Sequence, residues 1–492
     1  MMFDSDEQGV IYEISEAFSF FAPGYKYDRR YRNSIWDGRI HLANARTRLM
    51  PLGLIGELKR FCEHYGYDFV DQTEQHMITK IDPLDDFDSF VSSLNLPFEP
   101  RDYQIKAVKH AIEKNRTTVI SPTGSGKSLI IYLLIRWHLK YDRRFCLIVP
   151  TVSLVEQMRT DFENYAKNDP SFNVDEIVQT IGGKKTQGKT IDETKSIITT
   201  WQSLQHYDTS FYNSFDVMYV DEAHQATASV LQKIYSSAIN VPYRCGFTGS
   251  LDEEKIHHLQ LVGSLGDIFV VTTTKELQDN GTLSPLKIHM ITCKYPEDES
   301  KAFYRANKKD YKAEIDYLNA HLKRNMFIRN IVLASKGTTM LLFNFKVHGA
   351  ELSRLITEKV KEDGIDRKVF FIDGNVSADE REKIRQAMNE ENGCILISSV
   401  GTTATGLNIP SIQNVILCPS KSKIRNIQSI GRGLRNDKSS GKESCTVYDL
   451  VDDMSYGNGR SAHKNYCLKH AMDRLRQYQE QQFDIDFHTV KF

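Results

Sequence analysis

The residues with the clearest chemical potential lie in a glycine-rich segment that reads Ser-Pro-Thr-Gly-Ser-Gly-Lys-Ser at residues 121–128. It follows an apolar stretch that predicts a strand and precedes a stretch rich in Leu and Ile that predicts a helix. Gly124 and Gly126 let the backbone curl so that its amides point at phosphate oxygens, and the helix N-terminus faces the same oxygens. The segment predicts a nucleotide site made by Ser121, Pro122, Thr123, Gly124, Ser125, Gly126, Lys127 and Ser128.

Two side chains of this segment have specific expected roles. We expect Lys127 to neutralise the β- and γ-phosphates of the nucleotide and the Ser128 hydroxyl to coordinate magnesium. Ser121 stands where the general G-x-x-x-x-G-K-S pattern has its first glycine. A solvent-exposed Gly/Ser turn is the alternative interpretation, which the strand, loop and helix in register disfavour.

A second polar group, Asp221-Glu222-Ala223-His224, ends the apolar stretch at residues 217–220. Open parallel sheets place their chemistry at this end of a strand. Asp221 suits magnesium, directly or through water, and Glu222 suits a base that orients and deprotonates the attacking water. Alone, four residues of this kind could be an acidic helix N-terminus, but together with the phosphate loop they predict the other half of an ATP-hydrolysing site.

From Arg101 onward, short apolar stretches alternate with amphipathic stretches of helical period. Such alternation predicts an α/β fold with parallel sheets covered by helices. The strands form two series that divide near Ser284 and Pro285, so we expect two sheets. The predicted strands are residues 117–121, 145–149, 196–200, 217–220 and 244–248 in the first sheet, and 340–345, 369–373, 394–398, 414–418 and 445–450 in the second.

The remaining chain predicts two smaller parts. Residues 1–92 are rich in aromatic and arginine side chains, and we expect a small α+β nucleic-acid-binding domain there. The acidic stretch 82–88, followed by Pro97 and Pro100, is typical of a linker. The two sheet domains are predicted at residues 93–283 and 284–452, and residues 453–492 as a helical, basic-leaning tail that is either solvated or an auxiliary duplex contact.

The composition excludes several classes of protein. The chain has 492 residues, of which 40% are hydrophobic and 26% charged, as in a globular protein of several domains. No apolar stretch is long enough to span a bilayer, and the first residues lack the pattern of a secretory signal. Eight cysteines without a C-x-x-C pair argue against a disulfide framework and a structural zinc. Because 63 basic and 64 acidic residues nearly cancel, nucleic-acid binding must come from local patches.

The motifs, taken together, resemble those of superfamily 2 helicases. They follow one another in the family's order, which excludes a chance match to a single motif. The resemblance implies two tandem RecA-like domains that hydrolyse ATP between them, with ATP and Mg²⁺ as cofactors. The matching segments are residues 101–104, 121–128, 149–151, 199–201, the D-E-A-H box at 221–224, 248–250, 401–408 and 428–435.

Within that superfamily, the chain is similar to the UvsW-type recombination helicases of tailed phages. The likeness includes an N-terminal Trp36-Asp-Gly-Arg-Ile40 segment and a closing helix with Lys469, His470, Asp473 and Arg474. This resemblance implies an enzyme of recombination, repair and replication that moves 3′ to 5′ on branched DNA, such as forks and Holliday junctions, or on R-loops with their RNA–DNA hybrid. It also implies action in the host cytoplasm.

The resemblance further implies roles for residues outside the two nucleotide motifs. Gln104 should read the adenine edge, and Gly406 and Asn408 should lie near the ribose or γ-phosphate, where Asn replaces the family's Asp. Thr248 and Ser250, in contact with His224, should couple the ATP site to nucleic acid. Gln428, Arg432 and Arg435 should act on the transferring phosphoryl group from the second lobe, although an isolated Arg pair on a helix is usually a solvated face.

In this architecture the nucleic-acid strand lies across both lobes, and backbone amides and hydroxyls hold its phosphates. The resemblance assigns these contacts in the first lobe to Pro150, Thr151, Gly182, Gly183 and Thr200. In the second lobe it assigns them to Lys346, Thr402 and Thr403. For each threonine, a simple turn that caps a strand end is an equally good interpretation.

The N-terminal region interleaves aromatic rings with guanidinium groups at residues 25–39. Rings of this kind stack on unpaired bases, and arginines engage phosphates. We expect Arg29, Arg30 and Arg32 to form a DNA-facing patch, whereas Tyr27 and Trp36 are expected in the core of a domain this small.

Four functions remain open on this reasoning. The leading one is an ATP-dependent DNA helicase or branch-migration translocase. The same ATPase motor could act on RNA, or translocate on duplex DNA without separating its strands. The motor motifs do not decide between these nucleic-acid substrates. A P-loop kinase for a small molecule would not need the Gln428–Arg435 motif, and the intact Lys127 and Glu222 disfavour a binding protein that does not hydrolyse ATP.

Overall fold

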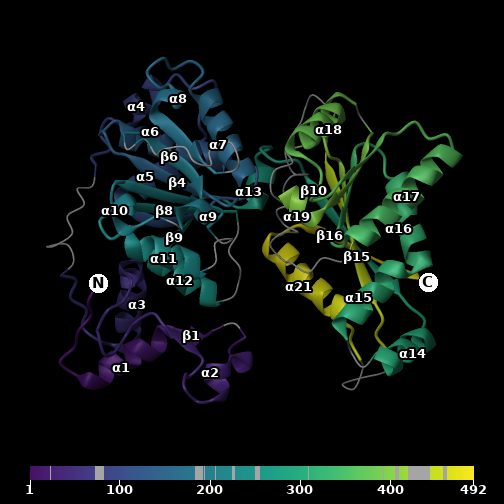
Figure 1. The fold of residues 1–492 in the computed structure, drawn as a ribbon, viewed down its shortest axis with the longest axis horizontal. Coiled ribbons are helices and arrows are strands. Elements are labelled where there is room, and N and C mark those ends of the chain that lie inside the picture. Colours follow the sequence, from purple (N-terminus) through teal and green to yellow (C-terminus); the bar gives the residue numbers. More distant parts are fainter. Residues whose placement is uncertain are drawn as a thin grey trace. The chain divides into compact units, whose positions relative to one another are not determined.

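The computed structural model describes residues 1–22, 24–72, 82–182, 192, 194–205, 207–223, 228–249, 255–307, 310–391, 393–404, 409, 411–418, 444–457 and 463–492. The chain forms two compact units. Residues 1–122 and 126–272 make the first, and residues 123–125 and 273–492 make the second. Each unit contains one large sheet flanked by helices (Figure 1).

The sheet of the first unit has seven parallel strands in the order β5-β6-β4-β7-β8-β3-β9. All five strands predicted for it are present within one residue of their expected ends. The two that the sequence did not predict, β5 and β9, are four-residue strands at the sheet edges with mixed exposure, so they lack an apolar stretch. The strands are β3 (Arg116–Ile120), β4 (Phe145–Val149), β5 (Val178–Ile181), β6 (Ser196–Thr200), β7 (Val217–Asp221), β8 (Tyr243–Thr248) and β9 (Asp267–Val270).

The core of the first unit centres on α6 (Lys127–Leu139), which is buried almost all round between the sheet and its neighbours. A helix that is hydrophobic on every face belongs inside a large domain rather than on its surface. The other helices of the unit are α1 (Gln8–Ala17), α2 (Arg29–Arg32), α3 (Ile55–Tyr65), α4 (Phe87–Ser93), α5 (Asp102–Lys114), α7 (Val152–Tyr165), α8 (Val174–Ile177), α9 (Trp201–Leu204), α10 (Thr209–Tyr212), α11 (Ala228–Ser237) and α12 (Lys255–Leu265).

The N-terminal residues form a small α+β layer that shares a core with the first sheet domain. Strands β1 (Ser19–Phe21) and β2 (Arg39–His41) pair antiparallel between α1 and α3. Apolar side chains of α1 and α3 pack in one cluster with Leu259 and Val262 of α12. At Gly53 the two parts approach so closely that a Cβ would lie 2.0 Å from the Val262 carbonyl oxygen. The N-terminal layer is therefore anchored to the first lobe by buried apolar surface.

The acidic stretch that was expected to be a linker is instead part of the first lobe. Asp82 is only 4% exposed, and its carboxylate accepts hydrogen bonds from Trp137 Nε1 at 3.1 Å and Arg143 Nη2 at 2.7 Å. Phe87, at the start of α4, is fully buried beside Trp137. The linker interpretation was wrong because its acidic residues have buried and basic partners that lie more than fifty positions away in the sequence.

The second unit holds a second sheet of seven parallel strands, in the order β12-β13-β11-β14-β15-β10-β16. The five predicted strands are present, each with ends within about two or three residues of expectation. The strands are β10 (Leu286–Lys294), β11 (Thr339–Phe343), β12 (Val369–Ile372), β13 (Ile395–Ser399), β14 (Asn414–Leu417), β15 (Cys445–Asp453) and β16 (Asp484–Lys491). The helices are α13 (Thr274–Asp279), α14 (Glu297–Asn307), α15 (Tyr311–Ala320), α16 (Leu322–Ala334), α17 (Lys346–Glu362), α18 (Ala378–Glu390), α19 (Val400–Ala404) and α21 (Tyr466–Glu480).

The sequence predicted a helical C-terminal tail, but the structure shows a helix followed by a strand. Helix α21 is present, but β16 follows it and pairs with β10 along eight residues. β16 was missed because it is an edge strand with charged side chains and mixed exposure, so it lacks both an apolar stretch and a regular alternation. No helix in the described part of the chain is both long and apolar enough to cross a membrane.

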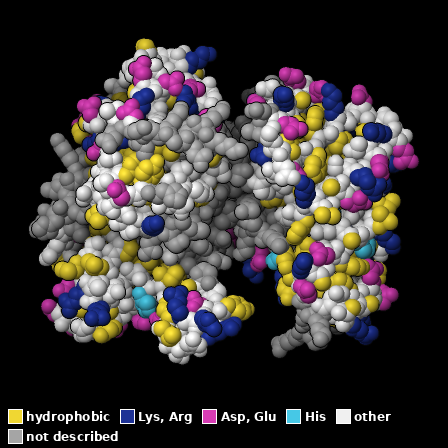
Figure 2. Space-filling model, in the orientation of Figure 1, with side chains coloured by type: hydrophobic (Ala, Val, Ile, Leu, Met, Phe, Trp, Pro, Cys, Tyr) yellow, Lys and Arg dark blue, Asp and Glu magenta, His cyan; other side chains and the backbone are white. Residues whose placement is uncertain are grey.

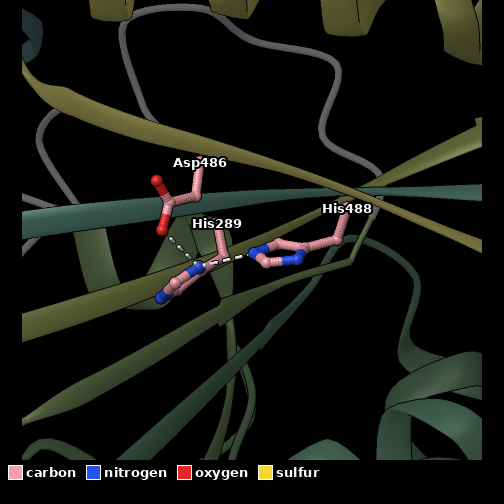
Figure 3. Close-up of side chains that lie close together, drawn as sticks. All are labelled: His289, Asp486 and His488. Atoms are coloured by element: carbon pink, nitrogen blue, oxygen red, sulfur yellow. Dashed lines mark hydrogen bonds and ion pairs between the residues drawn. The ribbon is translucent and has the colours of Figure 1, made fainter.

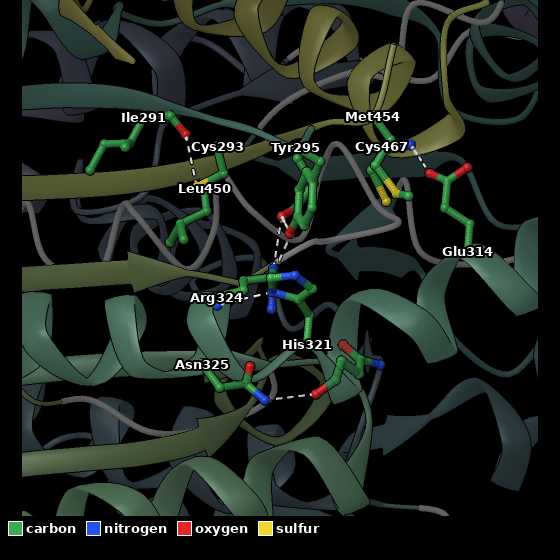
Figure 4. Close-up of polar contacts among 12 residues, drawn as sticks. Ile291, Cys293, Tyr295, Glu314, His321, Arg324, Asn325, Leu450, Met454 and Cys467 are labelled. Atoms are coloured by element: carbon green, nitrogen blue, oxygen red, sulfur yellow. Dashed lines mark hydrogen bonds and ion pairs between the residues drawn. The ribbon is translucent and has the colours of Figure 1, made fainter. Parts of the chain in front are cut away.

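A buried polar network ties the helices of the second unit to β15 (Figure 4). The Arg324 guanidinium on α16 donates to Asp452 at 2.8 Å, and the Tyr295 hydroxyl donates to the same carboxylate at 2.9 Å. The Glu314 carboxylate on α15 accepts from the backbone N–H of Cys467 at 2.8 Å, at the start of α21. Because these groups are fully enclosed, each depends on its partner to offset the cost of burial.

Candidate active site

The phosphate loop has the backbone that its sequence predicts. Gly124 and Gly126 have φ values of +85° and +82°, in the left-handed region that favours glycine. Gly126 precedes the first residue of α6, so the loop ends at a helix N-terminus. The Ser121 N–H donates to the Thr248 carbonyl oxygen at 2.9 Å, which joins the loop to the end of β8. The loop is thus held in a shape that can receive phosphate oxygens.

Lys127 brings the two halves of the predicted site together. Its Nζ atom lies 2.9 Å from Asp221 Oδ1 and 2.6 Å from Glu222 Oε1. The lysine opens α6, whereas Asp221 ends β7 and Glu222 follows it, so residues more than ninety positions apart in the sequence meet here. Burial disfavours the Lys127 ammonium, but the two carboxylates outweigh it and raise its pKa above the usual value. Burial raises the pKa of Asp221 too, an effect that the ammonium opposes.

Glu222 adopts an unusual backbone conformation. Its φ is +49°, which is uncommon for a residue other than glycine and costs on the order of 1 kcal/mol. Its N–H donates to Asp221 Oδ1 at 2.9 Å, so the turn after β7 is closed by the neighbouring carboxylate. Backbone strain of this kind is concentrated at functional sites. The conformation directs the Glu222 carboxylate toward Lys127 at the carboxyl edge of the sheet.

Tyr165 is a site residue that the sequence did not single out. Its hydroxyl shares a hydrogen bond with the Ser128 hydroxyl, with the two oxygens 2.7 Å apart. Its ring packs edge-on against Phe98 at 5.7 Å between centroids. In the sequence Tyr165 is one more apolar position of an amphipathic helix, and its place beside the phosphate loop becomes visible only in the fold.

Gln104 lies against the phosphate loop. Its Oε1 atom accepts from the Arg101 N–H at 2.9 Å and thereby caps α5. A Cβ added to Gly126 would lie 2.3 Å from its Nε2 atom, so the glycine leaves room for this side chain. The structure therefore places the expected adenine-reading residue against the phosphate loop, buried and with its amide oxygen already engaged.

Part of the predicted site lies outside the described residues. This holds for the coupling residues His224 and Ser250, although their partner Thr248 is seen buried at the end of β8, next to β3. It holds as well for Gly183 of the expected nucleic-acid edge, for the side chain of Thr403, and for Gly406, Asn408, Gln428, Arg432 and Arg435.

The first-lobe residues expected to contact nucleic acid meet at one edge of the sheet. Thr151 follows β4, with Pro150 between them, and Thr200 ends the paired strand β6. Each threonine caps a helix: Thr151 Oγ1 accepts from the Leu154 N–H, and Thr200 Oγ1 accepts from the Ser203 N–H, both at 3.3 Å. Gly182 follows β5, and a Cβ there would lie 3.8 Å from the Thr200 side chain. Both threonines therefore cap turns, as the alternative interpretation had it. The helices that they cap, α7 and α9, begin at the same edge of the sheet.

The second-lobe candidates follow two neighbouring strands in the same way. Lys346 begins α17 after β11, is largely exposed, and lies with its Nζ atom 2.8 Å from Asp373 Oδ2. Thr402, in α19 after β13, shares a hydrogen bond with the Ser399 hydroxyl, with the oxygens 2.7 Å apart. β11 and β13 are paired in parallel, so both candidates lie at one carboxyl edge. Ser399 is a further polar group at this edge that the sequence did not indicate.

The N-terminal patch is exposed, and neither of the two rings expected in the core is fully buried. Arg29, Arg30 and Arg32 form α2 on the surface, where Figure 2 shows Lys and Arg side chains gathered beside hydrophobic ones. Arg30 stacks over the half-buried Trp36 at 4.9 Å and pairs with its own neighbour Asp28. Tyr27, expected to be buried, is 82% exposed, because it lies in a one-turn helix at the surface.

Comparison with known proteins is consistent with this geometry. The family described as "DNA helicase UvsW, N-terminal" matches residues 3–71. "Type III restriction enzyme, res subunit" matches residues 97–253, and "Helicase conserved C-terminal domain" matches residues 322–437. The three matches thus fall on the N-terminal layer, the first sheet and the second sheet.

Individual proteins match over most of the chain. The ATP-dependent DNA helicase uvsW of Enterobacteria phage T4 is 32% identical, with 98% of this chain and 96% of that protein aligned. The crystal structure of T4 UvsW covers 99% of this chain and 97% of its own at 30% identity, with a TM-score of 0.48. A fragment of an HsdR subunit of a type I restriction enzyme from Vibrio vulnificus, 17% identical, covers 88% of this chain and 74% of its own with a TM-score of 0.56, and shows the fold alone. The chain belongs to the UvsW family of ATP-dependent DNA helicases, within superfamily 2.

Proposed function

We propose that this helicase unwinds or branch-migrates branched DNA, including forks, Holliday junctions and R-loops, by Mg²⁺-dependent ATP hydrolysis at Lys127, Asp221 and Glu222. The observation that carries the proposal is the contact of Lys127 with both carboxylates, 2.9 Å and 2.6 Å away, beside a phosphate loop of the required backbone shape. The phage origin of the relative supports action in the host cytoplasm.

The hydrolytic roles follow from the chemistry of these side chains. Triphosphate oxygens compete with the carboxylates for Lys127, so nucleotide binding frees Asp221 and Glu222 for their own tasks. Ser128 and Asp221 offer the oxygen ligands that Mg²⁺ prefers, and the ion would supply charge to the phosphates. Glu222 then accepts a proton from the attacking water. Gln428, Arg432 and Arg435 are proposed to complete the site from the second lobe.

The track is proposed to be DNA held by its phosphates. In the first lobe, the helix N-termini behind Thr151 and Thr200 offer backbone amides at one edge, beside Gly182. In the second lobe, Lys346 and Thr402 stand at the corresponding ends of β11 and β13. Contacts of this kind carry no sequence information, which suits a motor that moves along any strand.

Preference for branched DNA is proposed to come from the N-terminal patch. Three arginines on one short helix can engage adjacent phosphates. The exposed Tyr27 ring adds a surface on which an unpaired base at a branch can stack, an interaction worth about 1–3 kcal/mol. The buried core that joins this layer to α12 would transmit its hold on DNA to the first lobe.

Steady-state ATP hydrolysis with no polynucleotide, single-stranded DNA, duplex, forked DNA and RNA tests the motor and its track. We expect forked or single-stranded DNA to stimulate turnover, and Lys127→Ala to abolish it while the protein stays folded. Lys140→Ala is the matched control, because Lys140 pairs with Asp86 near the other end of α6 and should leave turnover unchanged. Stimulation by RNA alone would favour an RNA track, and no stimulation would refute the motor.

Binding to forked DNA at fixed salt tests the patch. The triple change of Arg29, Arg30 and Arg32 to Ala should weaken binding and reduce the salt slope by about 0.9 for each phosphate that the arginines neutralise in the wild type. The matched control changes Arg354, Lys359 and Lys368, three cations of the second unit with carboxylate partners, of which Lys359 is partly buried. Equal affinity for the fork in the patch variant and the wild type would refute the role of the patch.

A further inference from the structure

The C-terminal strand brings together a group of side chains that the helicase motifs do not use. β16 pairs in parallel with β10 at the edge of the second sheet, with Asp486 directly opposite His289. His488 is two residues further along β16, so it lies on the same face of the sheet as Asp486. Figure 3 shows the three side chains turned toward one another above the strands.

The potential ligand atoms of these three residues converge. His289 Nδ1 lies 2.9 Å from His488 Nε2 and 3.7 Å from Asp486 Oδ2. One ligand atom from each of the three lies within 4.8 Å of the others. A tetrahedral zinc ion with Zn–N bonds of 2.0–2.1 Å holds its nitrogen ligands about 3.3 Å apart. The two imidazoles therefore need to separate by only a few tenths of an ångström to admit an ion between them.

The position of His289 is set by its neighbours on the sheet. Its ring stacks on Tyr448 of β15, with 5.4 Å between centroids and 19° between planes. This contact fixes the ring on one side while His488 approaches on the other. Lys287 Nζ lies 2.9 Å from Asp486 Oδ2, so the lysine ammonium already pairs with one oxygen of this carboxylate. The carboxylate has a second oxygen, and its two oxygens together offer about four acceptor sites.

We propose that His289, Asp486 and His488 form a binding site for a transition-metal ion of the zinc class that clamps the C-terminal strand to the second sheet. Two imidazoles and one carboxylate are ligands that suit Zn²⁺, and a water molecule would fill the fourth position at this exposed edge. Mg²⁺ is excluded as the occupant, because it prefers oxygen ligands in octahedral geometry. The site is thus distinct in chemistry from the ATP site.

The consequence of such a site is a cross-link between distant parts of the sequence. Among the described strands, β16 lies at the edge of the sheet and is bonded to β10 alone, and edge strands open more readily than central ones. Its metal ligands would join the last strand of the chain to β10, some two hundred positions earlier. Metal binding would stabilise the closed edge by an amount that grows with the logarithm of the free metal concentration above the dissociation constant, because two of the three ligands leave the site when the strand opens.

Titration of the full-length, untagged protein with Co²⁺ and Zn²⁺ tests the site. We expect a visible absorption spectrum typical of tetrahedral Co²⁺ that Zn²⁺ abolishes in a one-to-one ratio and that excess Mg²⁺ leaves unchanged. His488→Ala and Asp486→Ala should each weaken binding by at least about tenfold. His64→Ala is the matched control, since His64 is an exposed histidine on α3 of the first unit.

Lys287 supplies a variant that acts in the opposite direction. Lys287→Met removes the cation that competes for Asp486, so metal binding should become severalfold tighter. Hydrogen exchange gives a second readout: at metal concentrations one hundred times the dissociation constant, exchange of the β16 amides should slow by up to about 100-fold. A wild-type protein that binds Co²⁺ no better than His488→Ala would overturn the proposal and leave a hydrogen-bonded imidazole pair. Binding without slower exchange in β16 would overturn the clamp.

Discussion

Replacing Glu222 by Gln separates nucleotide binding from hydrolysis in a way that the structure makes quantitative. The amide has nearly the same shape, but it cannot accept the proton of the attacking water. Loss of a general base typically lowers a rate by about 10²–10⁴-fold, which is about 3–5 kcal/mol in the barrier. Because Lys127 lies 2.6 Å from Glu222 Oε1, the change also removes one of the two carboxylates that compete with phosphate for the ammonium.

Nucleotide affinity in Glu222→Gln should therefore be equal to that of the wild type or greater. Single-turnover hydrolysis measures the first effect, and titration with a fluorescent ATP analogue measures the second. Glu156→Gln, an exposed position on α7, is the control and should change neither. A fall in hydrolysis of less than about tenfold would refute the assignment of Glu222 as the base, and loss of nucleotide binding would show that the Lys127 contact is needed to shape the site.

Three further perturbations address other parts of the molecule. Tyr165→Phe removes the hydrogen bond to Ser128, so the Mg²⁺ concentration for half-maximal ATPase activity should rise by up to about tenfold. Nucleotide binding in the absence of Mg²⁺ should stay unchanged. An unchanged Mg²⁺ requirement would contradict this role. Asp452→Ala should destabilise the second unit by about 3–5 kcal/mol in urea unfolding, because the Arg324 charge would stay buried without its partner; a loss below about 1 kcal/mol would contradict it. Burial and the nearby Arg143 lower the pKa of His138 to about 3, so the folded state binds fewer protons than the unfolded state. The free energy of unfolding should therefore fall as pH drops below about 6.5, by about 2 kcal/mol between pH 7 and 5. A His138→Gln variant with the same pH dependence would refute this cause.

The sequence by itself determined the two-sheet fold and predicted the catalytic chemistry. The phosphate loop, the acidic pair and the strands before them are contiguous segments whose residue types and period report their own conformation. Local information of this kind was enough to predict that Lys127, Asp221 and Glu222 would meet at one edge of a parallel sheet. The structure adds the distances that show that they do.

Only the tertiary structure decided the features that depend on contacts between distant segments. The N-terminal layer belongs to the first lobe because its apolar side chains pack against α12. Tyr27 is exposed, although the small size of the N-terminal domain predicted that its ring would be in the core. Tyr165 reaches Ser128 from the end of another helix, and β16 is a strand because β10 offers it an open edge. In each case the local sequence is compatible with several environments. Packing against residues far away in the sequence decides which of them is adopted, and such packing leaves no local pattern in the sequence.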